Sequence, residues 1–171
     1  MLARIAVLTC AVVLLNHSEV LAQNEALLTG RYSFSAHGNR QTQGFTMMGD
    51  HVSREGTIRF DGNGTVTAVR FKETVDGDPL WFGGTGNATD VPYFVSGTYT
   101  VLGNGLGKIE LHFQITVIAS NQPHVVLLDE VWDISLANGG KSFFLDVDET
   151  MTTISGPLDQ KVTIVGEARA F

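Results

Sequence analysis

Glu130 is the residue in this sequence with the clearest potential for acid–base chemistry. It lies between Leu128 and Trp132 in a segment where apolar and polar residues alternate, which places its side chain on the apolar face. A carboxyl group removed from water is expected to have a raised pKa and can then exchange a proton with a bound substrate. Tyr32 and Tyr99 fall on comparable apolar faces and could donate hydrogen bonds beside it. The three residues form a candidate catalytic set; the alternative is that Glu130 is a structural carboxylate held by hydrogen bonds.

Three aspartates on the opposite, polar face indicate a second candidate chemistry. A tight turn at Asn138–Gly139 would set Asp129 opposite Asp148, with Asp146 nearby on the same strand. Like charges directly across a strand pair destabilise it, and a hard cation would relieve this repulsion. Carboxylate oxygens are the ligands that Ca²⁺ prefers, so Asp129, Asp146 and Asp148 are candidate metal ligands. The alternative is a solvated acidic patch that keeps the protein soluble.

Other recognisable enzyme signatures are missing. The sequence contains no Gly-x-Ser-x-Gly elbow, no His-Glu-x-x-His pair and no phosphate-binding glycine loop. The histidines beyond residue 22, namely His37, His51, His112 and His124, do not have the spacing of zinc ligands, so we do not expect zinc.

The elements that would position these residues are strands. Beyond residue 23 apolar residues recur with a period of two, and strong helical periodicity is absent. Short turns rich in glycine and asparagine separate the segments, a pattern typical of an antiparallel barrel or sandwich. We predict an all-β fold, a single antiparallel eight-stranded barrel, with strands near residues 29–37, 55–61, 65–74, 93–102, 108–118, 124–136, 141–149 and 160–171.

Three hairpins test this pattern, because a correct register must bring apolar residues together on one face. We expect a two-residue turn at 138–139, a five-residue loop at 103–107 and a three-residue loop at 62–64. The predicted pairs are Ile134 with Phe143, Trp132 with Leu145, Glu130 with Val147, Val101 with Ile109, Tyr99 with Leu111, Gly97 with Phe113, Phe60 with Val66 and Ile58 with Ala68.

The first residues have the pattern of a secretory signal. Arg4 precedes a short apolar run, and Val20-Leu21-Ala22 supplies small residues before a cleavage site at Gln23. We therefore expect a signal peptide at 1–22, a barrel domain at 23–171 and a secreted or periplasmic protein. The single cysteine, Cys10, lies in that segment, so no disulfide is expected in the domain. The net charge of −7 argues against a nucleic-acid partner, and no later segment is long and apolar enough to span a membrane.

Three stretches resemble a phrase that recurs in small secreted bacterial β-barrel proteins. They are Gly56-Thr57-Ile58-Arg59-Phe60-Asp61-Gly62-Asn63-Gly64, Ser96-Gly97-Thr98-Tyr99-Thr100-Val101 and Val165-Gly166-Glu167-Ala168-Arg169. The barrel of those proteins is similar to the lipocalin-like or allene-oxide-cyclase-like class. This resemblance implies an interior pocket for an apolar molecule, sometimes with isomerase or cyclase activity.

Three functions follow as hypotheses. The first is a barrel that binds a small apolar ligand in its interior, since eight strands leave room for side chains or one small ligand. The second is an isomerase or cyclase with Glu130 as general acid or base, and the third is a structural or interaction protein with a solid core. Trp81 lies in the long connection 75–92, which either covers the barrel end as core or forms a binding loop. The candidate ligand contacts are Trp132, Phe113, Leu111, Phe60 and Trp81.

Overall fold

The computed structural model describes residues 24–42, 50–75, 78–82, 92–119, 122–153, 156–158 and 160–171. The predicted signal segment 1–22 lies outside this part of the chain. The strands are β1 (Thr29–Thr42), β2 (Asp50–Asp61), β3 (Val66–Val75), β4 (Asp78–Phe82), β5 (Tyr93–Val101), β6 (Leu106–Ala119), β7 (Gln122–Ala137), β8 (Ser142–Thr153), β9 (Gly156–Leu158) and β10 (Gln160–Ala170). Two 3₁₀ turns, η1 (Glu25–Leu27) and η2 (Asn138–Gly140), complete the elements. Within the described ranges, no helix has the length and apolar character needed to cross a membrane.

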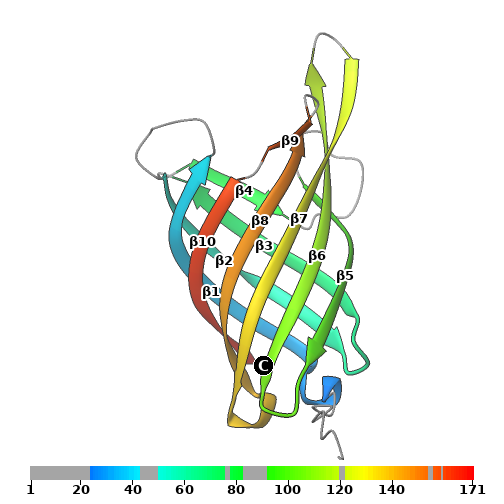
Figure 1. The fold of residues 1–171 in the computed structure, drawn as a ribbon, viewed down its shortest axis with the longest axis vertical. Helices are drawn as coiled ribbons and strands as arrows, with labels where there is room; N and C mark the ends of the chain where they lie inside the picture. Colours follow the sequence, from blue (N-terminus) through cyan, green and yellow to red (C-terminus); the bar gives the residue numbers. More distant parts are fainter. Residues whose placement is uncertain are drawn as a thin grey trace, which may run out of the picture.

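Eight of these strands form one antiparallel, nearly closed barrel (Figure 1). They are ordered β3-β2-β1-β10-β8-β7-β6-β5. Strands that follow one another among these eight are neighbours, except β3 and β5, and the first and last strands pair. The remaining gap, between β3 and β5, is bridged at Thr65 and Thr98. There the amide of Tyr99 donates to the carbonyl of Gly64 at 2.9 Å. The weakest junction of the barrel therefore lies in the middle of the chain and not at its ends.

The eight predicted strands are all present, and the eight-stranded antiparallel barrel is confirmed. Alternate residues of β7 are buried, including Leu128, Glu130, Trp132 and Ile134. Two short strands were not expected. β4 forms inside the connection predicted for 75–92 and pairs with the end of β3, and β9 pairs with β8.

The predicted register of the β7–β8 hairpin is wrong by two residues. Asn138, Gly139 and Gly140 all have positive φ angles of 53°, 65° and 85°, so the turn is longer than the expected two-residue turn. Ala137 consequently pairs with Ser142. The observed pairs are Ile134 with Leu145, Trp132 with Val147, Glu130 with Glu149, Asp129 with Thr150, Val131 with Asp148 and Asp133 with Asp146. Because side chains alternate with a period of two, this shift leaves the predicted inward and outward faces unchanged.

The other two hairpins also depart from the predicted pairs. In β5–β6 the pairs are Val101 with Gly107, Tyr99 with Ile109 and Gly97 with Leu111, and a β-bulge between Phe94 and Ser96 changes the pairing beyond them. In β2–β3 Phe60 pairs with Val66 as predicted, but a bulge at Arg59 and Phe60 then sets Ile58 opposite Val69. Bulges insert an extra residue on one strand, and nothing in the alternation of apolar residues marks their position here.

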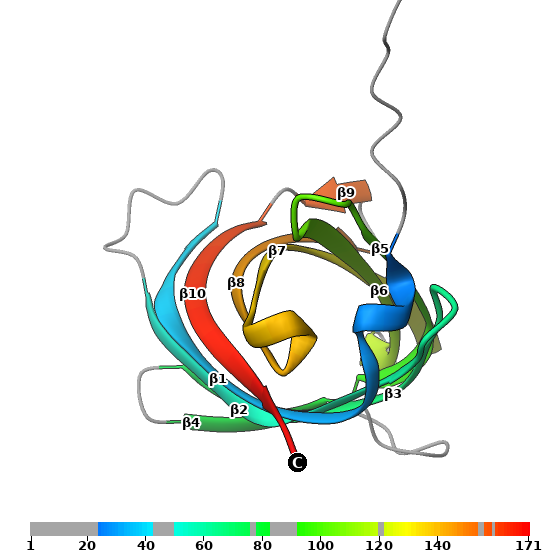
Figure 2. The ribbon, with the colours of Figure 1, turned by 90° about the horizontal axis from the view of Figure 1, so that it is seen from below.

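One end of the barrel is closed by its own chain. η1 and the η2 turn lie across this opening when the barrel is viewed from below (Figure 2). Leu28, which follows η1, is fully buried, and the amide of Asn24 donates to the carbonyl of Val101 at 2.7 Å. Gly140 packs against the backbone of Leu27, so close that a Cβ atom there would overlap with the Leu27 carbonyl. The two closing elements therefore contact each other directly.

Above this end an aromatic core fills the barrel. Neighbouring rings lie with centroids 4.8 to 6.0 Å apart. All of these pairs meet edge to face, a favoured geometry for aromatic pairs, except Tyr32 and Phe143, whose planes are tilted by 48°. The contacts form two groups: one contains Tyr99, Phe60, Tyr32 and Phe143, and the other contains Trp132, Phe34, Phe71, Phe113 and Phe94.

Candidate functional site

A cluster of three charged side chains lies inside the barrel. Arg54, on β2, is completely buried, as are Glu73 on β3 and Glu130 on β7, with exposed fractions of 0%, 0% and 1%. Arg54 Nε is 2.6 Å from Glu73 Oε2, and Arg54 Nη1 is 2.9 Å from Glu130 Oε1. We call these three residues the interior charge cluster. They carry a net charge of −1 when all three are ionised.

The strand arrangement explains how these residues meet. Arg54 and Glu73 are direct partners in the β2–β3 ladder, so they start side by side on the inner face. Glu130 is not on a neighbouring strand, because β1, β10 and β8 separate β2 from β7 in the barrel order. The long Arg54 side chain therefore crosses the interior. Its partner on β1 is Ala36, a small buried residue that leaves space for it.

Aromatic side chains hold the cluster on two sides. The indole N–H of Trp132 donates to Glu130 Oε2 at 2.8 Å, so both oxygens of this carboxylate lie close to a donor. The guanidinium carbon of Arg54 lies 5.0 Å from the ring centroid of Phe71, a cation–π distance. The cluster is thus a set of charges fixed in an apolar, aromatic surrounding, where electrostatic interactions are stronger than in water.

The two candidate tyrosines lie at the closed end, where their hydroxyl groups bind the backbone. Tyr99 donates to the carbonyl oxygens of Leu28 at 2.8 Å and of Glu25 at 3.0 Å. Tyr32 donates to the carbonyl oxygen of Gly140 at 2.6 Å. Burial raises the pKa of both tyrosines, which keeps the hydroxyl groups protonated as donors. The structure joins Glu130 to Arg54 and Trp132, whereas the tyrosines anchor η1 and the η2 turn.

Four of the five candidate ligand contacts belong to the core. Trp132, Phe113, Leu111 and Phe60 are all buried and form part of one apolar cluster. Trp132 lies against the interior charge cluster, and Phe60 lies among the rings of the closed end next to Tyr32 and Tyr99. The side chain of Trp81 lies outside the described part of the structure.

The three candidate metal ligands are exposed on the outer face and are not gathered. Asp129 lies 2.6 Å from Nδ1 of His112, Asp146 faces Asp133 across the β7–β8 ladder, and Asp148 faces Val131. Over the residues that the structure describes, no three histidine, cysteine or carboxylate side chains form a group that could hold a metal ion. The two-residue shift of the hairpin is the reason that Asp129 and Asp148 are not partners.

Sequence reasoning missed two of the three charged residues of the cluster. Arg54 shares the parity of Val52, Ile58 and Phe60, so the period of two does place it on the apolar face of β2. Starting the predicted strand at residue 55 removed it from that face. Glu73 likewise follows Val69 and Phe71 on the inner face of β3. An arginine and a glutamate in phase with apolar residues on adjacent strands were the signal that could have identified the cluster.

No family model matches the chain, and no curated protein or solved structure is significantly similar to it.

Proposed function

We propose that this protein is a binding barrel that holds a small, mainly apolar molecule in its interior, with one polar group of that molecule recognised by the interior charge cluster. The observation that carries the proposal is the complete burial of Arg54, Glu73 and Glu130 among aromatic side chains. Buried ionisable groups with specific charge partners are concentrated at functional sites.

The energetic argument supports a role beyond stability. Removing charges from water is expensive, and well-packed apolar residues in their place are often as stable or more stable. A barrel of this size is able to fill its interior with side chains alone, as it does around Phe60 and Tyr32. Three buried charges are therefore a feature that a purely structural core does not require.

The position of the cluster also fits a binding site. Arg54 and Glu73 lie towards the ends of β2 and β3 that are farthest from η1. A ligand would thus enter from the end opposite η1, with Phe113 and Trp132 beside it and the cluster in front of it. The closed end, held by Tyr99 and Tyr32, would remain unchanged.

Binding is favoured over the acid–base alternative by the geometry of the candidate catalytic set. The hydroxyl groups of Tyr32 and Tyr99 are engaged with backbone carbonyls and the carboxylate of Glu130 is engaged with Arg54 and Trp132. An isomerase or cyclase that uses Glu130 would have to recruit other partners. The resemblance to lipocalin-like or allene-oxide-cyclase-like barrels is compatible with interior binding, and secretion remains our expectation for where the protein acts.

The experiment uses Trp132 as a reporter. The chain contains two tryptophans, so Trp81→Phe leaves Trp132 as the single emitter. We would titrate this variant with N-phenyl-1-naphthylamine, a neutral aromatic probe with one N–H donor whose absorption overlaps tryptophan emission. Saturable energy transfer from Trp132 to the probe is the expected result, because the indole lies against the proposed site.

A matched pair of variants assigns the site. Glu130→Gln in the same background keeps the side-chain shape and is expected to weaken binding of the probe several-fold. Asp148→Asn on the outer face should leave the affinity for the probe unchanged. Near-ultraviolet circular dichroism confirms that each variant is folded. A folded protein without saturable transfer would refute the proposal and favour the solid-core alternative.

A further inference from the structure

The outer wall of the barrel carries a hollow that is separate from the interior. Its volume is about 730 Å³, and it extends over β1, β10, β8, β7 and the first residue of β6. Three of its lining residues are large apolar side chains exposed to solvent: Phe144 at 60%, Val165 at 52% and Leu106 at 49%. Exposed apolar side chains are ordinary when scattered, but a contiguous group in a concave surface marks an interaction site.

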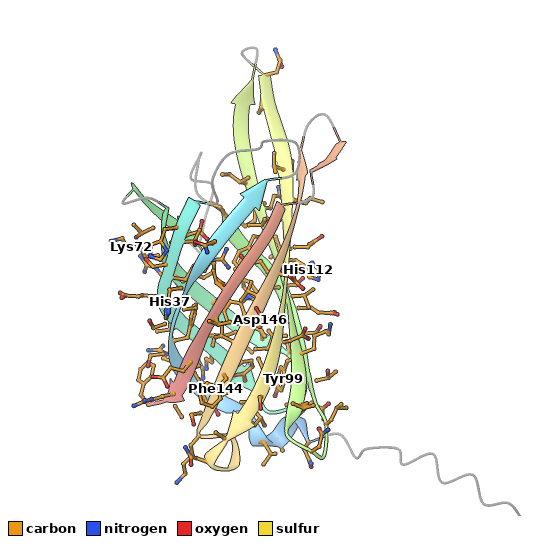
Figure 3. The ribbon with its side chains drawn as sticks, turned by 60° about the vertical axis from the view of Figure 1, so that its left-hand side comes forward. His37, Lys72, Tyr99, His112, Phe144 and Asp146 are labelled. Carbon is orange, nitrogen blue, oxygen red and sulfur yellow. The ribbon has the colours of Figure 1, made fainter. Side chains whose placement is uncertain are left out.

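The strand register shows how these residues come together. One row across the ladder holds Ser35, Glu167, Phe144, Ser135 and Leu106, each directly opposite the next. The row beside it holds His37, Val165, Asp146, Asp133 and Lys108. Glu167 and the small residue Ser135 flank Phe144 in the first row, and acidic residues follow Val165 in the second. The hollow thus has an apolar centre beside a line of carboxylates; Figure 3 labels His37, Phe144 and Asp146 on this wall.

The charges of the hollow are unbalanced. Its lining includes the carboxylates of Asp133, Asp146 and Glu167 but neither a lysine nor an arginine. Asp133 lies 3.4 Å from Lys108, and Glu167 lies 3.0 Å from Arg169, both of which are outside the lining. Among the described residues no cation pairs with Asp146, which directly faces the like charge of Asp133. Like charges opposite each other destabilise a strand pair, and a bound cation would remove that cost.

We propose that this hollow binds a small organic ammonium ion with an aromatic or aliphatic body. The body would cover Phe144, Val165 and Leu106, and the ammonium group would lie against Asp146, with the Phe144 ring available for a cation–π contact. Phe144 and Asp146 point to the same side of β8, roughly 7 Å apart along the strand. This distance fits one molecule with an apolar part and a charged end. A second copy of the chain is a poor occupant, because it would bring a net charge of −7 towards an acidic surface.

The test compares three probes that share one body. They are 4-phenylbutylamine, 4-phenylbutan-1-ol and 4-phenylbutyrate, which end in a cation, a neutral group and an anion. Each is titrated into ¹⁵N-labelled protein while the amide resonances of Phe144, Asp146 and Val165 are followed. We expect the amine to saturate with a Kd on the order of 1 mM, the alcohol to bind more weakly and the carboxylate not to bind. Added salt should weaken binding of the amine but not binding of the alcohol.

Variants separate this site from a general attraction to an acidic protein. Asp146→Asn should weaken binding of the amine about threefold, because an exposed ion pair contributes modestly to affinity. Binding of the alcohol should be unchanged. Phe144→Ser should weaken binding of both the amine and the alcohol. The matched control is Asp148→Asn, an exposed aspartate on the same strand that is not part of the lining and should change neither.

Three results would overturn the proposal. The first is equal weakening of the amine by Asp146→Asn and Asp148→Asn, which indicates unspecific attraction. The second is a resonance shift confined to interior residues such as Trp132, which assigns the probe to the interior site. The third is a dimer in sedimentation analysis that Phe144→Ser dissociates, which assigns the hollow to a second copy of the chain.

Discussion

Arg54→Met removes the cation that Glu73 and Glu130 share. Methionine is unbranched and flexible, so it replaces much of the arginine stem and the main loss is the charge. The two carboxylates remain in a place where their side chains have no exposed surface. Breaking a buried ion pair by removing one partner costs about 3–5 kcal/mol, because an uncompensated charge stays buried. We expect this loss in the free energy of unfolding.

The magnitude translates into a large change in melting temperature. For a domain of this size, about 1 kcal/mol shifts Tm by roughly 2–4 °C, so Arg54→Met should lower Tm by about 6–20 °C. Differential scanning calorimetry measures this shift. The matched control is Arg59→Met, which changes an exposed arginine on the same strand and should stay within about 0.5 kcal/mol of the wild type.

A second variant distinguishes charge from packing. The triple variant Arg54→Met, Glu73→Met and Glu130→Gln removes all three charges and keeps an amide oxygen as acceptor for the Trp132 N–H. It should recover most of the stability lost in the single variant, since replacing a whole buried ion cluster is often neutral. A Tm of Arg54→Met equal to that of Arg59→Met would refute this explanation, and so would a triple variant that is less stable than Arg54→Met.

Three further predictions concern the closed end. Burial raises the pKa of Tyr99 and Tyr32 above the value near 10 of the unfolded chain. The contribution of these tyrosines to the free energy of unfolding is therefore complete below pH 10 and is lost as the pH rises above it. Thermal unfolding between pH 9 and 11 should show this decline, and Tyr99→Phe should make the decline shallower. The same variant removes the hydroxyl donor of the Leu28 carbonyl, whereas the Glu25 carbonyl still accepts from the Leu28 amide. Losing this donor costs about 1–3 kcal/mol and should speed hydrogen exchange around Leu28; unchanged exchange would contradict the anchoring role. Gly140→Ala should destabilise the protein more than Gly139→Ala in urea unfolding. Both residues have a positive φ angle, but only at position 140 would the new Cβ overlap with another backbone segment. Equal losses in the free energy of unfolding would show that only the backbone strain of the positive φ angle matters.

The faces of the strands were predictable because they follow from a local rule. Successive side chains of a strand point to opposite sides, so the period of two in residues 124–136 was enough to place Glu130 and Trp132 inside and Asp129 and Asp133 outside. The eight strands and their antiparallel order follow from the same alternation together with the turn residues between them.

The registers were less predictable because they depend on the backbone of a few residues. Three consecutive positive φ angles at Asn138–Gly140 and the bulge next to Phe60 each changed the pairing without changing the pattern of apolar residues. Each side chain kept its predicted inward or outward face, but its partner on the neighbouring strand changed. For this reason the expected opposition of Asp129 and Asp148 was wrong while their exposure was predicted correctly.

The sequence by itself determined an all-β barrel, the alternation of its faces and the burial of Glu130. Only the tertiary structure decided what Glu130 contacts, because Arg54 reaches it across the barrel from a strand four places away in the sheet and more than seventy residues away in the chain. Closure of the sheet likewise turned Tyr99 towards η1 and gathered Phe144, Val165 and Leu106 on one outer wall. Alternation is a property of neighbouring residues, whereas these contacts depend on the curvature and register of the whole sheet, which no single segment encodes.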